Sequence, residues 1–455
     1  MGVKLSSLRL SRGRIGGYVN TEFTPEIAAE FGAVLGTFLG ERSIVVTARD
    51  YYPPSRMIKR AFTAGLMSTG VTVIDFHATT TPELVYAIKR FGAKAGVQFS
   101  VSNVEENYIN LKIFDSHGIE YSADKLDNMR EKARQGKIIR TRPERIGWVT
   151  YAEYIHDIYI ASLINYIDAD PIINSFIRVI ADLNYGPTDT VLPELLSQLG
   201  VDLISLNAHK PPVFKGVYNL PKIDSIKNLS AAVKAMGIDL GVAFSADASS
   251  IFVVDDEGVP LEPDELFALL IKYYATGAVV TTTSSSQVTE YTAEEVGLKV
   301  YRVEYMPDSV SRTIRRRRAS MGGTDCGEYV FTGFSPSPDG LLTLLRILEL
   351  IAKTEKPLSK LRRELKKPRS YSVPVEIEAG RAQDAVFELA RNREIDDILV
   401  TPLGAKIKVA NKWFTVKVLD ENRLAIESEK IRSKKKLAEI GEQIKLLLSK
   451  RSYVP

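Results

Sequence analysis

Residues 43–48 (SIVVTA) and 71–77 (VTVIDFH) decide the fold of this chain. Short runs rich in Val and Ile are typical of buried strands. Between them, residues 55–68 carry apolar side chains at helical spacing. A further helix at 82–91 and a further strand at 95–100 follow. This alternation of strand and helix predicts a parallel sheet covered by helices on both faces.

The same alternation extends outward in both directions. Before it, Thr24 and Pro25 open a predicted helix that ends at residue 39. After it, the alternation restarts twice. The second unit has predicted strands at 176–183, 202–207 and 240–244 and helices at 189–199 and 229–236. The third unit is predicted to open at 249–254 and to continue with strands at 278–282 and 299–304 and helices at 262–275, 293–296 and 340–354.

The pattern changes after a charged segment at 356–369, which is predicted to be a linker with a helix. Strands are predicted at 372–378, 406–409, 413–418 and 423–428, with helices at 382–391 and 431–449. We therefore predict an α/β chain with three consecutive mixed or parallel α/β sandwich domains and a C-terminal α+β domain. The expected domain boundaries are 1–148, 149–250, 251–368 and 369–455.

Composition and charge exclude several classes of protein. The 455 residues are 45% hydrophobic and 25% charged with a net charge of +4, an ordinary balance for a globular protein. The single cysteine, Cys326, excludes an internal disulfide and a cysteine metal site. We see no apolar run of about 18 residues and no apolar signal core after the basic start. We therefore expect a cytoplasmic protein without a membrane partner.

Five short motifs occur in order along the chain: GGYVN at 16–20, Arg49-Asp50, FDSHG at 114–118, LGVAFSADASSIFVV at 240–254 and FSPSPDG at 334–340. Their order and spacing resemble the phosphohexomutases, the phosphoglucomutase/phosphomannomutase family, over almost the whole chain. The resemblance implies four domains around a central cleft. It also implies an isomerase of carbohydrate metabolism that uses a phosphoserine and Mg²⁺ to move a phosphoryl group on a hexose phosphate.

The resemblance assigns the nucleophile to Ser102, in a loop that reads SVSNVE where the family has TASHNP. It also matches Lys112 with a lysine that the family uses in proton transfer. A hydroxyl and a cation are therefore retained, although the histidine, asparagine and proline of the loop are not. The alternative interpretation of Ser102 is an ordinary polar loop residue.

The metal loop departs further from the family pattern, because DGDADR is replaced by SADASS at 245–250. Asp247 keeps the only carboxylate, with Ser245 and Ser249 as neutral neighbours. Mg²⁺ prefers several anionic oxygens in an octahedral arrangement. We therefore expect Mg²⁺ to bind weakly or not at all, and a solvated turn aspartate is an equal alternative for Asp247.

The loop expected to bind the sugar reads GTDCGE where the family has GEXSGH. Thr324 replaces the glutamate that would accept hydrogen bonds from sugar hydroxyls, and Asp325 is a substitute displaced by one residue. Threonine lacks the charged oxygens of a carboxylate, so contact with a sugar is expected to be weaker. The resemblance also assigns Arg49, after the first strand, to the substrate.

The phosphate loop RPSGTEP is replaced by a shorter turn, VLDEN, with Lys417 and Arg423 on either side. These two cations remain for a phosphate, but the turn's acidic residues would repel a dianion and lysine lacks the bidentate fork of arginine. A simple hairpin turn is the alternative that we favour. In the family's opening motif an arginine position holds Gly16, and Arg12 or Arg14 is the candidate replacement.

Two functions from different classes stay open. The chain is a working phosphohexomutase (phosphomannomutase or phosphoglucomutase), or it is a catalytically inactive homologue, a pseudoenzyme that binds or regulates. Loss of one preorganised electrostatic stabiliser costs ~3–4 kcal/mol of barrier. Departures in four loops therefore predict that standard turnover is weak or lost. The expected partners are a hexose phosphate if the chain is active, and a second copy or an active paralogue.

A third alternative is an anionic polymer bound by consecutive arginines, Arg315, Arg316, Arg317 and Arg318. Such charge runs are usually solvated helix faces, so we do not expect nucleic acid as the ligand.

Overall fold

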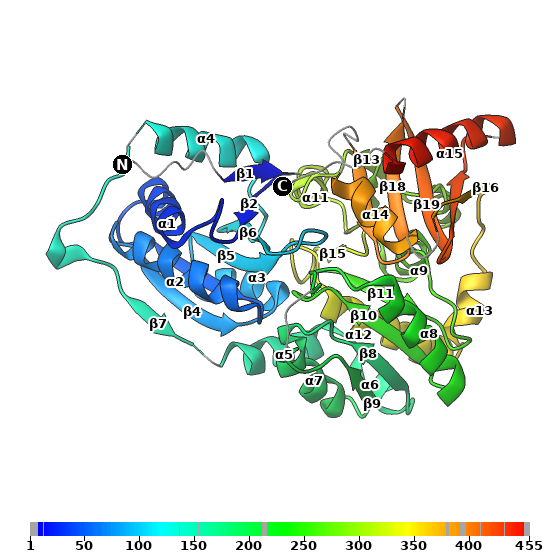
Figure 1. Ribbon diagram of the computed structural model, residues 1–455. Helices are drawn as coiled ribbons and strands as arrows, with labels where there is room; N and C mark the ends of the chain where they lie inside the picture. Colours follow the sequence, from blue (N-terminus) through cyan, green and yellow to red (C-terminus); the bar gives the residue numbers. More distant parts are fainter. Residues whose placement is uncertain are drawn as a thin grey trace.

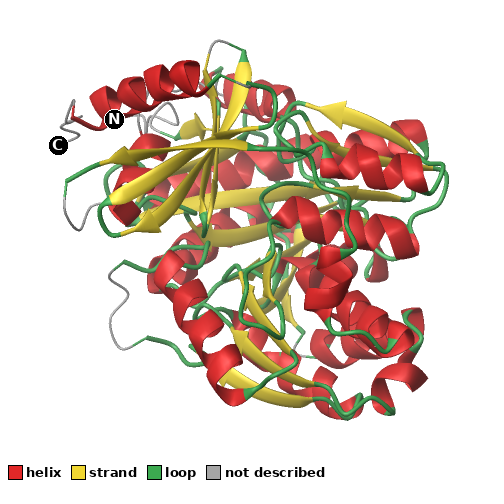
Figure 2. Ribbon diagram, turned by 90° about the vertical axis from the view of Figure 1, so that its right-hand side faces the viewer, coloured by secondary structure: helices red, strands yellow, loops and turns green. Residues whose placement is uncertain are grey.

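The computed structural model describes residues 8–11, 13–135, 137–152, 154–211, 216–378, 382–391, 397–409, 411–431 and 433–449. The described strands form four separate sheets of seven, four, four and five strands, and we name the units built on them domains I to IV in chain order. Domain I, blue to cyan in Figure 1, lies to one side of the other three. In the view turned by 90°, helices flank the strands (Figure 2). This architecture confirms the predicted three α/β domains and the α+β end.

Domain I contains the predicted alternation. Its elements are β1 (Arg9–Ser11), β2 (Arg14–Tyr18), α1 (Pro25–Leu39), β3 (Ile44–Arg49), α2 (Pro53–Met67), β4 (Thr72–Ala78), α3 (Thr81–Arg90), β5 (Ala95–Val101), β6 (Tyr108–Asp115), α4 (Ala123–Arg134), a 3-10 turn at Pro143–Arg145 and β7 (Val149–Tyr151). The strand order is β1-β2-β6-β5-β3-β4-β7. Strands β5, β3 and β4 are parallel as predicted, and β7, which was not predicted, is parallel to β4. Strands β6, β2 and β1 were not predicted either, and each pairs antiparallel with its neighbours. Because β7 belongs to this sheet, domain I extends past the expected boundary at residue 148.

Neighbouring residues in β3 point to opposite faces of this sheet. Val45 packs in the core that contains α1 and α2, and Val46 packs in the core under α3. Such alternation is the geometry of a strand buried on both faces. Helices α1 and α2 approach closely because Gly32 and Gly65 lie at their crossing. A Cβ at Gly32 would lie 2.1 Å from the carbonyl oxygen of Phe62.

Domain II has the sheet order β11-β10-β8-β9. Its elements are α5 (Ile155–Tyr166), α6 (Ala169–Ile173), β8 (Arg178–Asp182), a 3-10 turn at Pro187–Thr190, α7 (Leu192–Gln198), β9 (Asp202–Leu206), α8 (Ile223–Met236), β10 (Leu240–Phe244) and β11 (Ile251–Val254). The prediction that residues 249–254 open the third unit is wrong. The turn at 245–250 folds β11 back antiparallel to β10, so β11 is the edge strand of the second sheet.

Domain III has the sheet order β13-β12-β14-β15. Its elements are α9 (Pro263–Tyr274), β12 (Ala278–Thr282), α10 (Val288–Glu295), β13 (Lys299–Val303), α11 (Ser309–Arg317), β14 (Met321–Gly323), β15 (Tyr329–Phe331), α12 (Gly340–Thr354) and α13 (Leu358–Arg363). The predicted helix at 340–354 is confirmed with the same bounds, and Asp339 caps it by accepting from the Leu342 N–H. One continuous apolar core joins domains II and III.

Domain IV is an antiparallel sheet in the order β16-β20-β19-β18-β17. Its elements are β16 (Tyr371–Glu376), α14 (Ala382–Arg391), β17 (Ile398–Thr401), β18 (Gly404–Val409), β19 (Lys412–Asp420), β20 (Arg423–Ser428) and α15 (Lys434–Ser449). The four strands predicted from the sequence are present, and β17 was not predicted. None of the described helices is both long and apolar enough to cross a membrane.

Candidate functional site

The loop at 245–250 lies where three domains meet. Its backbone accepts hydrogen bonds at the N-terminal ends of two helices. The Thr81 N–H, at the start of α3 in domain I, donates to the Asp247 carbonyl at 2.9 Å. The Gly340 N–H, at the start of α12 in domain III, donates to the Ala248 carbonyl at 3.0 Å. N–H groups in a first helical turn have no partner within the helix, so this docking satisfies donors that would otherwise be unpaired.

The carboxylate of Asp247 is fully buried and receives donors on both oxygens. Oδ1 accepts from the hydroxyls of Ser245 at 3.0 Å and Ser249 at 2.8 Å. Oδ2 accepts from the Thr81 hydroxyl at 2.8 Å and from the Lys112 ammonium. The predicted solvated turn aspartate is therefore wrong, because this side chain is enclosed by other domains.

Lys112 supplies the opposite charge from β6 in domain I. The ammonium also donates to Ser249 Oγ at 3.1 Å, and the lysine side chain is only 3% exposed. Burial alone would raise the pKa of Asp247, but the Lys112 ammonium and the hydroxyl donors hold it well below its usual range. The carboxylate and the ammonium therefore form a closed, neutral pair.

These residues do not fit Mg²⁺. A magnesium site needs several oxygen ligands, with at least one carboxylate free to face the ion. The one carboxylate in this loop already accepts from four side chains, one of them a cation. In the part of the chain that the structure describes, no group of three His, Cys, Asp or Glu side chains is placed to hold a metal ion.

Ser102 follows β5 and its side chain is 4% exposed. Its Oγ accepts long hydrogen bonds from the N–H groups of Glu105 at 3.3 Å and Val104 at 3.4 Å. The hydroxyl also donates to the Glu105 carboxylate at 3.5 Å. This carboxylate beside the hydroxyl would repel a phosphate placed on Ser102.

Asn219, from the segment before α8, connects the Ser102 loop with the Asp247 loop. Its N–H donates to the Ser102 carbonyl at 2.9 Å, and its carbonyl accepts from the Ala246 N–H at 2.7 Å. Its side chain donates to Asn103 Oδ1 at 3.0 Å and accepts from the Asp247 N–H at 3.1 Å. Sequence reasoning did not single out Asn219, because no pattern marks a lone asparagine in an irregular segment.

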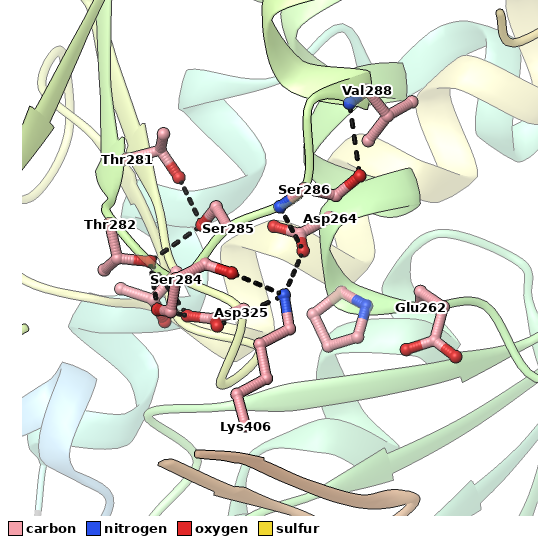
Figure 3. Close-up of polar contacts among 12 residues, drawn as sticks. Glu262, Asp264, Thr281, Thr282, Ser284, Ser285, Ser286, Val288, Asp325 and Lys406 are labelled. Atoms are coloured by element: carbon pink, nitrogen blue, oxygen red, sulfur yellow. Dashed lines mark hydrogen bonds and ion pairs between the residues drawn. The ribbon is translucent and has the colours of Figure 1, made fainter. Parts of the chain in front are cut away.

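The predicted sugar loop lies against domain IV. Asp325 Oδ1 accepts from the hydroxyls of Thr282 at 2.9 Å and Ser284 at 3.1 Å. Lys406, in β18, places its ammonium 3.3 Å from Asp325 Oδ2 and donates to Asp264 Oδ2 at 2.7 Å (Figure 3). The Thr324 hydroxyl accepts from the N–H groups of Cys326 at 3.3 Å and Glu328 at 3.4 Å. It therefore stabilises the turn of its own loop. Neither Lys406 nor Asp264 was predicted.

A pocket of about 250 Å³ lies between domains III and IV. Lys417 borders it, but its ammonium already pairs with Glu262 at 2.8 Å and Glu427 at 2.9 Å. Arg423 lies outside this pocket lining and pairs with Asp420 through Nε at 2.7 Å, on the exposed hairpin. The two cations predicted for a phosphate are therefore engaged by acidic residues, and the favoured hairpin interpretation agrees with the strand pairing of β19 and β20.

Arg49 and Arg14 both make contacts within domain I. The guanidinium of Arg49 donates to the Asp50 carbonyl at 2.6 Å. The guanidinium of Arg14, in β2, forms a two-point pair with Glu120, in the segment between β6 and α4, at 2.7 Å and 3.0 Å. Arg12 lies outside the described residues.

Family models match three consecutive parts of the chain. Phosphoglucomutase/phosphomannomutase alpha/beta/alpha domain I matches residues 11–138, domain II matches 157–258 and domain III matches 262–368. The chain belongs to the phosphoglucomutase/phosphomannomutase family. The resemblance seen in the sequence motifs is thereby confirmed, and with it the assignment of the three α/β domains to this family.

Curated relatives match this family member over most of its length. A phosphoglucomutase/phosphomannomutase of Thermococcus kodakarensis is 30% identical over 413 residues, which cover 88% of this chain and 90% of that protein. A probable phosphoglucosamine mutase of Methanopyrus kandleri is 28% identical, with 92% of each chain covered. Among solved structures, a putative phosphomannomutase from Thermus thermophilus has a TM-score of 0.76 at 19% identity, covering 99% of this chain and 100% of that one. That last likeness supports the fold alone.

Of the predicted site residues of this family member, the structure brings Lys112, Ser245, Asp247 and Ser249 into one cluster. Asn219 tethers the Ser102 loop to this cluster through the backbone. Asp325 and Lys417 lie at the contact between domains III and IV.

Proposed function

We propose that this member of the phosphohexomutase family has lost magnesium-dependent phosphoryl transfer and serves as a binding or regulatory protein for a phosphorylated hexose. One observation carries the proposal: the buried carboxylate of Asp247 is closed by Lys112, Thr81, Ser245 and Ser249. Phosphoryl transfer depends on positioning and on neutralising the charge of the phosphate. Without a metal ion beside Ser102, most of the negative charge of a transferred phosphate would not be neutralised.

Two further contacts support the loss of phosphoryl transfer. The Glu105 carboxylate lies 3.5 Å from the Ser102 hydroxyl, where a phosphate group would be repelled. Lys417 is held by two glutamates, so its charge is not free for the phosphate that does not react. Each missing stabiliser costs ~3–4 kcal/mol of barrier. Together they predict turnover near background.

The test is an activity assay of the purified protein with Mg²⁺, a trace of bisphosphate activator and, in turn, glucose 1-phosphate, mannose 1-phosphate and glucosamine 1-phosphate. We expect turnover at background and an intact mass without phosphate. The proposed binding of a phosphorylated hexose is tested by the shift of the thermal unfolding midpoint when glucose 6-phosphate is added. Inorganic phosphate is the control. Turnover that disappears in Ser102→Ala would overturn the loss of activity, and equal shifts with sugar phosphate and phosphate would overturn the hexose specificity.

A second candidate, a phosphohexomutase of low rate, is favoured by the N–H groups of Val104 and Glu105 that point to Ser102 Oγ. Such donors are of the kind that hold phosphate oxygens. Under this candidate, Glu105→Gln raises the rate because it removes the repelling charge while keeping the shape. An unchanged background rate in Glu105→Gln would exclude it.

A further inference from the structure

The hydroxyl groups of Ser245 and Ser249 in the 245–250 loop each both donate and accept a hydrogen bond. Ser245 Oγ donates to Asp247 at 3.0 Å and accepts from the Ser250 N–H at 2.9 Å. Ser249 Oγ donates to Asp247 at 2.8 Å and accepts from the Lys112 ammonium at 3.1 Å. A hydroxyl binds a metal through an oxygen lone pair, and at Ser249 the oxygen already accepts from the ammonium.

The charges in this cluster also balance without an added ion. Lys112 contributes one positive charge and Asp247 one negative charge, and both side chains are almost wholly buried, at 3% and 0% exposure. A divalent cation would add two positive charges next to a buried ammonium, with one carboxylate in direct contact to offset them. Taking charges out of water is costly unless they are paired, so the cluster favours one cation and excludes a second.

We propose that the Lys112 ammonium is the resident cation of this loop and that it keeps a divalent metal out of a latent metal site. The loop has a central aspartate, and its backbone accepts from the first N–H groups of two helices. The cation beside this aspartate is the Lys112 side chain. Two further positions of the loop that could offer ligands carry serines, Ser245 and Ser249, which donate to Asp247. The proposal concerns the same site as the proposed function, but its test measures metal binding and not turnover, so the two can fail separately.

The first experiment uses the unaltered protein and Mn²⁺ alone. Electron paramagnetic resonance reports free Mn²⁺, and we expect the full free signal in the presence of an equal amount of protein. We also expect millimolar MgCl₂ to leave the unfolding temperature unchanged. Stoichiometric loss of the Mn²⁺ signal that is reversed in Asp247→Asn would overturn the proposal.

The second experiment opens the latent site. Ser245→Asp and Ser249→Asp restore two carboxylates, and Lys112→Met removes the ammonium while keeping an apolar chain of similar length. Because affinity for such cations rises with the number of charged ligands, we expect the triple variant to bind Mn²⁺ roughly 100-fold more tightly than the unaltered protein. Its unfolding temperature should rise when Mn²⁺ is added.

The matched control keeps Lys112 and carries only Ser245→Asp and Ser249→Asp. We expect this double variant to bind Mn²⁺ more weakly than the triple variant, because the ammonium still occupies the site. Equal affinity in the two variants would overturn the role given to Lys112. A folded triple variant that binds no Mn²⁺ would overturn the latent site itself.

Discussion

Lys406 in domain IV and Asp264 in domain III, 142 residues apart in the chain, are joined by a hydrogen bond of 2.7 Å between Nζ and Oδ2. The ammonium also donates to the Ser284 carbonyl at 3.0 Å. Burial alone would lower the pKa of Lys406, but Asp264 and Asp325 raise it above its ordinary value. The lysine therefore stays charged and holds the two domains together.

Removing this cation should loosen the contact. Lys406→Met leaves Asp264 and Asp325 buried without a counter-charge, and breaking a buried pair from one side typically costs about 3–5 kcal/mol. The readout is the unfolding midpoint reported by Trp413, which borders the same pocket. The second tryptophan, Trp148, is 72% exposed and can be replaced by Phe to isolate the signal.

Lys408 provides the matched control, two residues further along β18. Its ion pairs with Asp397 at 3.2 Å and Glu304 at 3.4 Å involve more exposed carboxylates. Exposed pairs contribute little, so Lys408→Met should leave the midpoint nearly unchanged. If both variants shift the midpoint equally, the buried cluster is not what holds domain IV in place.

Thr81 offers a test of the Asp247 cluster that leaves the charges untouched. Thr81→Val keeps the shape and the backbone hydrogen bond to the Asp247 carbonyl but removes the hydroxyl that donates to Oδ2 at 2.8 Å. Hydrogen bonds to charged groups contribute about 1.5–3 kcal/mol, and urea unfolding should show a loss of that size. Thr289→Val is the control, because the buried Thr289 hydroxyl has no hydrogen-bond partner in the described structure. A loss no larger than that of Thr289→Val would show that the Thr81 hydroxyl is not needed.

Much of the fold could be predicted because its signals are local. The strand β3 is a short run of β-branched residues, and α12 has a capping aspartate followed by apolar residues at helical spacing. Helix α11 was missed because its mean hydropathy is dominated by arginines, although Val310 and Ile314 are buried on its inner face. The strand β11 was assigned to the wrong unit because a sequence does not show which sheet a strand joins.

The site could be predicted only in part. The motifs indicated that Lys112 and Asp247 matter, but their pairing joins residues 135 positions apart and depends on how two domains dock. Lys406 carried no signal at all, since a lysine in an amphipathic strand is ordinarily a solvated residue. Its partner became evident only from the packing of β18 against domain III. Long-range ion pairs of this kind are a product of tertiary structure.

Gly186 limits the space behind the Asp247 loop. A Cβ at this position would lie 1.9 Å from the Ala246 carbonyl oxygen, far inside contact distance. Gly186→Ala should therefore displace the loop and destabilise the protein by about 3 kcal/mol, measured by urea unfolding. Gly237→Ala is the comparison: nothing lies within 4 Å of the added Cβ, and the left-handed φ of 61° should cost only about 1 kcal/mol. A smaller loss at Gly186 than at Gly237 would mean that the loop adjusts freely.

Asp339 should give the folded protein a measurable pH dependence. Burial raises its pKa to about 6 from 3.8, although the Leu342 N–H and the Tyr159 hydroxyl donate to the carboxylate and oppose the shift. The folded state therefore keeps this proton at a pH where the unfolded chain has lost it. The resulting stability, on the order of 3 kcal/mol, is present below pH 4 and is lost as the pH rises towards 6.

Asp339→Asn separates this proton from the helix cap, because asparagine caps a helix about as well as aspartate. Compared with the unaltered protein, the variant should gain relative stability steadily between pH 4 and pH 6 and hold that gain at higher pH. Burial also raises the pKa of Asp50 to about 6. Its effect on stability changes with pH in the same way in both proteins, so it cancels in the difference between them. The measurement is the free energy of unfolding in urea at intervals across this range. Parallel profiles for the two proteins would show that Asp339 does not take up a proton on folding.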